Sequence, residues 1–197
     1  MAALREFSDK GLSGARVDVI ARLARVNKRM LYHYFGNKHD LFSAVLEHKL
    51  AQREAMLASA PEDPCETLPY WFDAACRDVD WFRLLGWEAL QRSDRALVHE
   101  EQRRAISIQA LEQTRRRQAK GLLPAGLDPA HLLLTMMAIT AFPLTLPQTT
   151  RLVTGRSALD PEFQQDRRRF LKQFAKLLRA VDKGEDKVGG AAHIRGA

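Results

Sequence analysis

The sequence predicts an all-α fold. Apolar residues recur at helical spacing in one segment after another, and no run shows the alternation of a β-strand. Asn, Asp, Pro and Gly stand where helix ends are expected. With 197 residues and 46% hydrophobic content, the chain can form one sizeable core or two small ones.

Four helices are predicted in the first 60 residues. Leu4 and Phe7 face inward from the first, which Gly11 ends. Asn27 and Asn37 cap the third and fourth helices, because their side chains accept hydrogen bonds from the first-turn amides. In chain order the four helices are Ala2–Lys10, Ala15–Ala24, Lys28–Phe35 and Asn37–Ala58.

The rest of the chain is also predicted to be helical. The segment "APEDP" (residues 60–64) breaks it, and Asp128 with Pro129 caps a later apolar helix. "TTRLVTGRSALDP" (residues 149–161) is predicted to be a loop. The remaining predicted helices are Cys65–Arg77, Val79–Arg92, a polar helix Arg95–Lys120 and a last amphipathic helix Pro161–Val181.

Composition restricts the class of protein. A net charge of +7 and a pI near 9.7 favour a polyanionic or acidic partner. The two cysteines, Cys65 and Cys76, are expected to be reduced thiols of a cytoplasmic protein. No leading signal peptide is expected from the first residues, and no apolar run reaches about 18 residues, so no membrane segment is predicted.

The stretch "NKRMLYHYFGNK" (residues 27–38) places cations at the positive ends of two helix dipoles. Lys28 and Arg29 follow one N-cap, and Lys38 follows the other. A cation at such a position costs about 0.3–1 kcal/mol. A phosphate beside these residues would reverse the local field, and Arg16 near the start of the preceding helix fits the same pattern.

The turn "ARVN" (residues 24–27) between the second and third helices is very short, as in a helix-turn-helix motif. Such a motif places its second helix in the major groove of DNA. Met30, Leu31, Tyr34 and Phe35 should form the inward stripe of that helix, and Tyr32 and His33 should point outward. A solvated basic face is the alternative. The predicted DNA-binding residues are Arg16, Asn27, Lys28, Arg29, Tyr32, His33 and Lys38.

The segment "FSDKGLSGARVDVIARLARVNKRMLYHYFGNKHDLFSAVL" resembles the N-terminal DNA-binding domain of the TetR family of bacterial transcriptional regulators. Leu31-Tyr32, Phe35 and Lys38 carry much of the resemblance. Three features depart from the family pattern. Arg25 stands where the family usually has Gly, Ala15 stands where Thr is frequent, and Met1 lies almost inside the first helix.

The resemblance implies three regions. Residues 1–45 would be the helix-turn-helix DNA-binding domain, residues 46–182 a helical ligand-binding and dimerisation domain, and residues 183–197 a disordered tail. "GLLPAGLDPAHLLLTMMAI" and "LVTGRSALDPEF" also resemble segments of one subtype of the family.

The family's regulatory domain implies a small-molecule pocket and a homodimer interface. Glu88 would anchor a cationic effector or pair with an Arg, and the aromatic side chains fit a pocket or an ordinary core. The residues predicted to bind the ligand are Tyr70, Trp71, Phe72, Trp81, Trp87 and Glu88, and those predicted at the dimer interface are Met136, Phe170, Phe174, Leu177 and Leu178.

An enzyme is not predicted. The chain has no Gly-rich phosphate loop, "HEEQR" lacks the second His of a zinc-protease helix, and no Cys/His cluster has metal spacing. No cofactor and no metal are expected. The predicted function is a TetR-like transcriptional repressor that binds operator DNA and is relieved by an unidentified effector. The alternatives are an effector-independent architectural DNA-binding protein and a helical small-molecule-binding protein with an incidental basic N-terminus.

Overall fold

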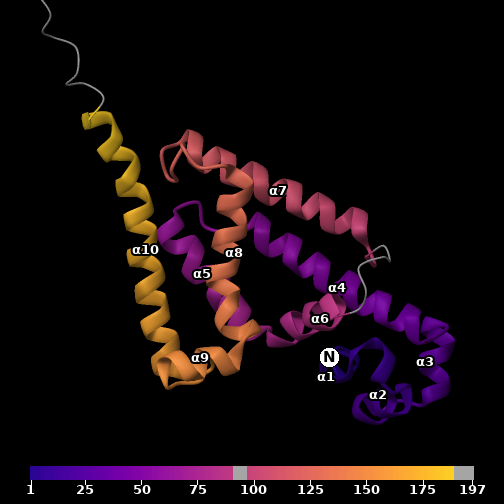
Figure 1. Cartoon of the computed structure of the whole chain (residues 1–197). Coiled ribbons are helices and arrows are strands. Elements are labelled where there is room, and N and C mark those ends of the chain that lie inside the picture. The colour runs from indigo at the N-terminus through magenta and orange to yellow at the C-terminus, as the bar shows by residue number, and fades with distance from the viewer. Residues whose placement is uncertain (91–96, 189–197) are drawn as a thin grey trace, which may run out of the picture. The chain divides into compact units, whose positions relative to one another are not determined.

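The computed structural model describes residues 1–90 and 97–188, and all regular elements in this part of the chain are α-helices (Figure 1). The all-α prediction is confirmed. In chain order the helices are α1 (Ala2–Gly14), α2 (Val17–Ala24), α3 (Lys28–Phe35), α4 (Lys38–Ala58), α5 (Pro64–Arg77), α6 (Val79–Leu90), α7 (Glu100–Ala119), α8 (Pro129–Thr145), α9 (Pro147–Thr154) and α10 (Pro161–Val188).

Three predicted N-caps are confirmed. The Asn27 side chain accepts from the amide of Arg29 at 2.8 Å, and Asn37 likewise caps α4. Asp128 caps α8, with Pro129 at its first position. Each cap satisfies first-turn amides that have no partner within the helix, so these helices begin where the sequence predicts.

The predicted loop over residues 149–161 is wrong in its first half, because α9 occupies Pro147–Thr154. Pro147 suits the first position of a helix, where its missing N–H costs nothing. Gly155 ends the helix in a left-handed conformation, with φ of 72°. Thr150 is buried, and its hydroxyl donates to the Pro143 carbonyl at 3.1 Å, which ties α9 to α8.

Two predicted helix ends also differ from the structure. The last helix continues to Val188, so residues 183–188 of the predicted tail are helical, and residues 189–197 lie outside the described residues. The polar helix α7 begins at Glu100 and not at Arg95, which is itself outside the described residues.

The described chain forms two compact units. Unit one comprises residues 1–59 and 77–107, of which residues 1–59, 77–90 and 97–107 are described. Unit two comprises residues 60–76 and 108–197, of which residues 60–76 and 108–188 are described. The predicted domain boundary after residue 45 falls inside α4, which is continuous.

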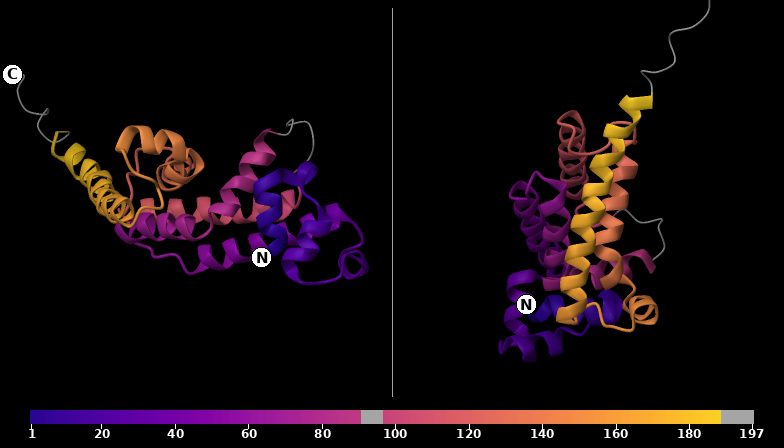
Figure 2. Two further views of the ribbon diagram at one scale, coloured as in Figure 1. Left: turned by 90° about the horizontal axis from the view of Figure 1, so that it is seen from below. Right: turned by 90° about the vertical axis from the view of Figure 1, so that its left-hand side faces the viewer.

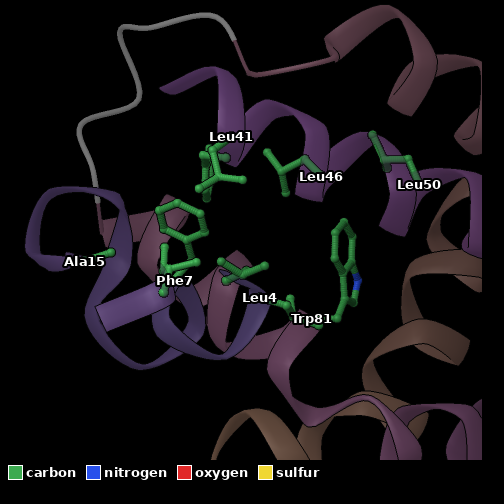
Figure 3. Close-up of a cluster of buried hydrophobic side chains, with 10 residues drawn as sticks. Leu4, Phe7, Ala15, Leu41, Leu46, Leu50 and Trp81 are labelled. Carbon is green, nitrogen blue, oxygen red and sulfur yellow. The ribbon is translucent and has the colours of Figure 1, made fainter. Parts of the chain in front are cut away.

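Unit one is built around a core to which α1, α4 and α6 contribute. Figure 3 shows Leu4 and Phe7 of α1, Leu41 and Leu46 of α4, and Trp81 of α6 gathered in this core. Phe7 is fully buried, and its ring meets the edge of Phe42 at 5.1 Å between centroids. Burial of such side chains stabilises a fold by about 1.5–3 kcal/mol each, so this core is the platform on which α2 and α3 are held.

Gly11 allows α1 and α6 to approach closely. It interrupts α1 with φ of 65° and ψ of 174°, a conformation that favours glycine. A Cβ at this position would lie 3.0 Å from the Trp87 ring. The Trp87 indole N–H donates to the Ser8 carbonyl at 3.0 Å, so this hydrogen bond ties α6 to α1 in addition to the packing.

In unit two, α9 joins α8 to α10, which both extend away from it (Figure 1 and the right-hand view of Figure 2). Three ion pairs connect α10 with α5 and the residues before it. These pairs are Arg168–Asp73 at 2.6 Å, Lys172–Glu66 at 2.9 Å and Arg179–Asp63 at 3.1 Å. Among the described residues no single helix is long and apolar enough to cross a membrane. Only α8 and α9 together, bent by 86°, meet that test, by length and composition alone.

Candidate nucleic-acid interface

Arg25 closes the turn between α2 and α3. Its backbone is left-handed, with φ of 56° and ψ of 37°. The Val26 amide donates to the Ala21 carbonyl at 3.0 Å, which satisfies a carbonyl at the end of α2. A non-Gly residue in this conformation costs on the order of 1 kcal/mol. The chain therefore keeps a cation at this turn in spite of backbone strain.

Helix α3 lies largely open to solvent. None of its side chains is buried, and only Leu31 and Phe35 pack against the core of unit one. The predicted inward positions of Met30 and Tyr34 are wrong, since these side chains are 47% and 71% exposed. A two-turn helix that meets its unit along one edge can cover only one narrow stripe, and the rest of α3 is left accessible to a partner.

The predicted outward positions of Tyr32 and His33 are confirmed, because both are exposed. The Lys28 ammonium lies over the Tyr32 ring, 5.8 Å from its centroid. Arg29 is exposed as well, and Asn27 caps the helix with its side chain. The N-terminal half of α3 thus presents two cations, a phenol and the positive end of the helix dipole on one accessible surface.

Arg16 stands at the start of α2 and is paired within the chain. Its guanidinium donates to Asp18 at 3.0 Å, and both side chains are largely exposed. The pKa of Asp18 lies below its usual value: desolvation acts to raise it but is outweighed by the hydrogen bond and charge of Arg16 and by the charge of Lys28. Because the Arg16–Asp18 pair is exposed, a phosphate can compete for the guanidinium at little cost.

Lys38 has a contact that the sequence does not reveal. Its ammonium donates to the carbonyls of Ser13 at 3.2 Å and Ala15 at 3.3 Å, where α1 ends. A cation is favourable at the C-terminal end of a helix. Lys38 therefore has a structural role in unit one, and part of the dipole penalty at the start of α4 is offset inside the protein.

Three further exposed basic side chains belong to the same surface. Arg22 and Arg25 make no side-chain hydrogen bond or ion pair with any described residue, and His39 follows Lys38 in the first turn of α4. Between Gly11 and His39 the sequence has six Lys and Arg residues against one Asp. A count of charges in this segment, beyond those at helix starts, would have found Arg22 and Arg25 from the sequence.

The residues predicted to line a ligand pocket are distributed over both units. In unit one, Trp81 belongs to the core, and the Trp87 indole N–H donates a hydrogen bond to the Ser8 carbonyl. Glu88 forms a bidentate ion pair with Arg103, with N–O distances of 2.7 and 3.1 Å. The Arg partner foreseen for Glu88 is confirmed, and the carboxylate is neutralised. In unit two, Phe72 is fully buried, whereas Tyr70 and Trp71 are half-buried with their rings edge to face.

The residues predicted at a dimer interface lie on α8 and α10. Phe170 and Leu177 are exposed, and Phe174 and Leu178 are half-buried. Met136 is buried within unit two, so it cannot contribute in the way its exposed neighbour Met137 can. The large apolar residues exposed on α8 and on residues 161–179 of α10 are Leu134, Met137, Phe142, Phe170 and Leu177.

The part of the chain that the structure describes contains no group of three or more His, Cys, Asp or Glu side chains placed to hold a metal ion. Cys65 and Cys76 form no disulfide and are half-buried. Burial and the neighbouring Asp63 carboxylate raise the pKa of the Cys65 thiol, which makes it less reactive than a typical surface thiol.

Two family models match the chain. Residues 1–45 match "Bacterial regulatory proteins, tetR family", and residues 70–176 match "Tetracyclin repressor-like, C-terminal domain". Together the two matches cover α1 to α3, the start of α4 and most of the C-terminal region.

Similar proteins agree with these matches. The transcriptional repressor SCO4008 of Streptomyces coelicolor is 32% identical, over 78% of this chain and 80% of its own length. The transcriptional repressor NicS of Pseudomonas putida is 34% identical, over 72% and 71%. The solved structure of SCO4942 of Streptomyces coelicolor superposes with a TM-score of 0.73 at 26% identity, covering 89% and 92%.

Proposed function

Because the chain belongs to the TetR family of bacterial transcriptional regulators, we propose that α3 enters the major groove of operator DNA and that α2 and its neighbouring cations hold the phosphates. The chain is a DNA-binding transcriptional repressor of this family, as the sequence predicts. The proposal has three parts: the residues that recognise operator DNA, the helices that form the homodimer, and the control of DNA binding by a small-molecule effector.

The accessibility of α3 is the observation that carries the DNA-binding proposal. All residues from Arg22 to Met30 are exposed, although they connect two helices that are anchored in unit one. Arg29 stands in the first turn of α3, where a helix-turn-helix motif contacts base edges, and it is the residue assigned to a guanine. Tyr32 and His33 follow on the same accessible helix and contact sugar and phosphate.

Phosphate contacts are assigned to the cations around α3. Arg16, Lys28 and Lys38 are predicted from the sequence, and the structure suggests Arg22 and Arg25 in addition. Each such contact releases condensed counterions from DNA, so it steepens the slope of log affinity against log salt concentration by about one unit. These contacts position the protein and carry no sequence information of their own.

Dimerisation through α8 and α10 is the second part of the proposal. The exposed apolar side chains on these helices include Met137, Phe170 and Leu177. Large apolar side chains that one chain leaves exposed are favourable to bury against a second copy. A two-fold dimer would present two copies of α3 to the two halves of a palindromic operator.

A small-molecule effector that weakens DNA binding is the third part. The match over residues 70–176 supports a regulatory domain there. The Glu88 carboxylate gives no support for a cationic effector, because its charge is already neutralised by Arg103. Any effector must bind the DNA-free form more tightly than the DNA-bound form, and DNA must weaken effector binding by the same factor.

Selection of DNA from a random duplex pool tests the proposal directly. The full-length protein should enrich a palindromic sequence, and fluorescence anisotropy should then measure its affinity against a scrambled duplex at several salt concentrations. Arg29→Ala should lower the affinity for the selected site by about 1–3 kcal/mol and leave binding to the scrambled duplex nearly unchanged.

Arg104→Ala is the matched control, since it removes one exposed cation from α7. It should leave the selected site bound as in the wild type. If no sequence is enriched, or if Arg29→Ala and Arg104→Ala behave alike, the recognition surface is wrongly assigned. If DNA is bound but no effector changes the affinity, the architectural alternative replaces the effector-controlled repressor.

A further inference from the structure

Helix α3 exposes two large side chains that phosphate contacts do not account for. It lies at the edge of unit one (Figure 1), where Leu31 and Phe35 pack against the core. Met30 and Tyr34 are four residues apart and therefore share another side of the helix. Both are exposed, although one is apolar and the other is an aromatic ring with a single polar atom.

Met30 is the one of these two that stands where a recognition helix reaches base edges. It is the third residue of α3, directly after Arg29, so it belongs to the first turn. In a helix-turn-helix motif the N-terminal residues of the second helix contact the bases. Tyr34 lies one turn further along the helix, and its ring meets the edge of the His33 ring at 5.3 Å between centroids.

The charges around Met30 favour DNA over a protein as the molecule that covers it. Residues 19–39 contain five Lys and Arg residues and no Asp or Glu, which complements a polyanion. A stable protein interface buries about 800 Å² on each partner, which the exposed flank of a two-turn helix does not supply. The same flank fits the width of a major groove, which admits one α-helix.

The major groove offers one apolar feature to such a side chain. The base edges there present hydrogen-bond donors and acceptors, except for the C5-methyl group of thymine. A methionine side chain is unbranched, flexible and polarisable, so it adapts to the position of a methyl group. Burial of one methyl-sized group corresponds to about a fourfold change in affinity.

We propose that Met30 contacts the C5-methyl group of a thymine in each operator half-site and thereby helps to determine sequence specificity. The inference rests on the proposed entry of α3 into the major groove. Adjacent Cα atoms are about 3.8 Å apart and base pairs about 3.4 Å apart, so this thymine lies within about two base pairs of the guanine assigned to Arg29. Half of the sequence information from the first turn of α3 then comes from a side chain that makes no hydrogen bond to a base.

Replacement of thymine by deoxyuridine in the selected operator tests this contact. Deoxyuridine keeps the base pairing and the O4 acceptor and lacks only the C5-methyl group. Each thymine of one half-site is replaced in turn, and fluorescence anisotropy measures the affinity of the full-length protein. At one position near the guanine, the replacement should weaken wild-type binding about fourfold.

Variants at Met30 connect this loss to the side chain. Met30→Ala should bind the thymine and deoxyuridine duplexes equally at that position, because the methyl group has lost its contact. Met30→Leu keeps an apolar side chain and should retain part of the difference. Leu127→Ala is the matched control, since it removes an apolar side chain that is exposed to nearly the same degree and lies in the loop before α8. It should show the full thymine preference of the wild type.

Two results would overturn the inference: no thymine replacement changes wild-type affinity, or the loss at the sensitive position persists in Met30→Ala. If either occurs while a palindrome is enriched and Arg29→Ala still weakens its binding, only the methyl contact is wrong and the DNA-recognition proposal stands. If no sequence is enriched from the pool, the DNA-recognition proposal fails and this inference fails with it.

Discussion

Replacement of Arg25 by glycine should make the protein more stable and a weaker DNA binder at once. The wild-type residue is left-handed at φ of 56°, which costs about 1–2 kcal/mol for a side chain with a Cβ. Glycine removes that strain but adds about 0.4–1 kcal/mol of conformational entropy to the unfolded chain. The net gain should be about 0.5–1 kcal/mol, or about 1–4 °C in Tm for a chain of this size.

DNA binding should change in the opposite direction. If the Arg25 guanidinium contacts a phosphate, Arg25→Gly should flatten the slope of log affinity against log salt by about 0.9. Affinity for all sequences should fall together, because a phosphate contact carries no sequence information. Thermal unfolding and anisotropy over a salt series measure the two effects on the same samples.

Arg25→Lys provides the control, since it keeps both the charge and the strained Cβ. It should match the wild type in stability and in salt slope. If Arg25→Gly is not more stable than the wild type, the left-handed backbone of Arg25 does not destabilise the protein. If the slope of log affinity against log salt is unchanged in Arg25→Gly, the Arg25 guanidinium does not contact the phosphates.

The remaining predictions concern other contacts. Lys38→Met should lower stability by about 1 kcal/mol in urea unfolding, because the Ser13 and Ala15 carbonyls at the end of α1 lose their donor, and should also flatten the slope of log affinity against log salt by about one unit; a change in slope alone would refute the structural role. Leu177→Glu should yield monomers in sedimentation with unit two still folded, and Lys176→Glu should not; identical sedimentation of both variants would remove α10 from the interface. The Cys65 amide and the Arg179 charge outweigh desolvation and keep the folded pKa of Asp63 below its unfolded value near 3.9, so its stabilisation is complete above about pH 5 and is lost as the pH falls through the folded pKa. The stability difference between wild type and Asp63→Asn should therefore shrink from pH 5 towards pH 2, and a constant difference would contradict this.

Local signals predicted the helices well where a cap residue was present. Asn27, Asn37 and Asp128 satisfy first-turn amides by their own side chains, and this chemistry depends on a few neighbouring residues only. The loop prediction over α9 failed because Pro147 and Gly155, considered separately, are both helix-breaking residues. In the structure Pro147 begins a two-turn helix and Gly155 ends it, and the Thr150 hydroxyl stabilises this helix by donating a hydrogen bond to the Pro143 carbonyl.

Side-chain orientation was predicted less well, because it depends on what the rest of the chain covers. Met30 and Tyr34 have the spacing of an inward stripe, yet their side chains are left 47% and 71% exposed. Trp81 and Trp87 look like pocket residues in the sequence, but one belongs to the core of unit one and the other bonds to Ser8, 79 positions away.

The sequence by itself determined the helical class and the capped helix starts, which follow from periodicity and cap residues that act over a few positions. It also indicated the family, through the resemblance of its N-terminal segment to the TetR family. Only the tertiary structure decided that Lys38 holds the end of α1, that Arg103 neutralises Glu88, and that Arg167 donates to the Ile139 carbonyl. The physical reason is that the partner of a charged side chain is chosen by distance in space, and residues 15 to 30 positions apart become neighbours only when the helices pack.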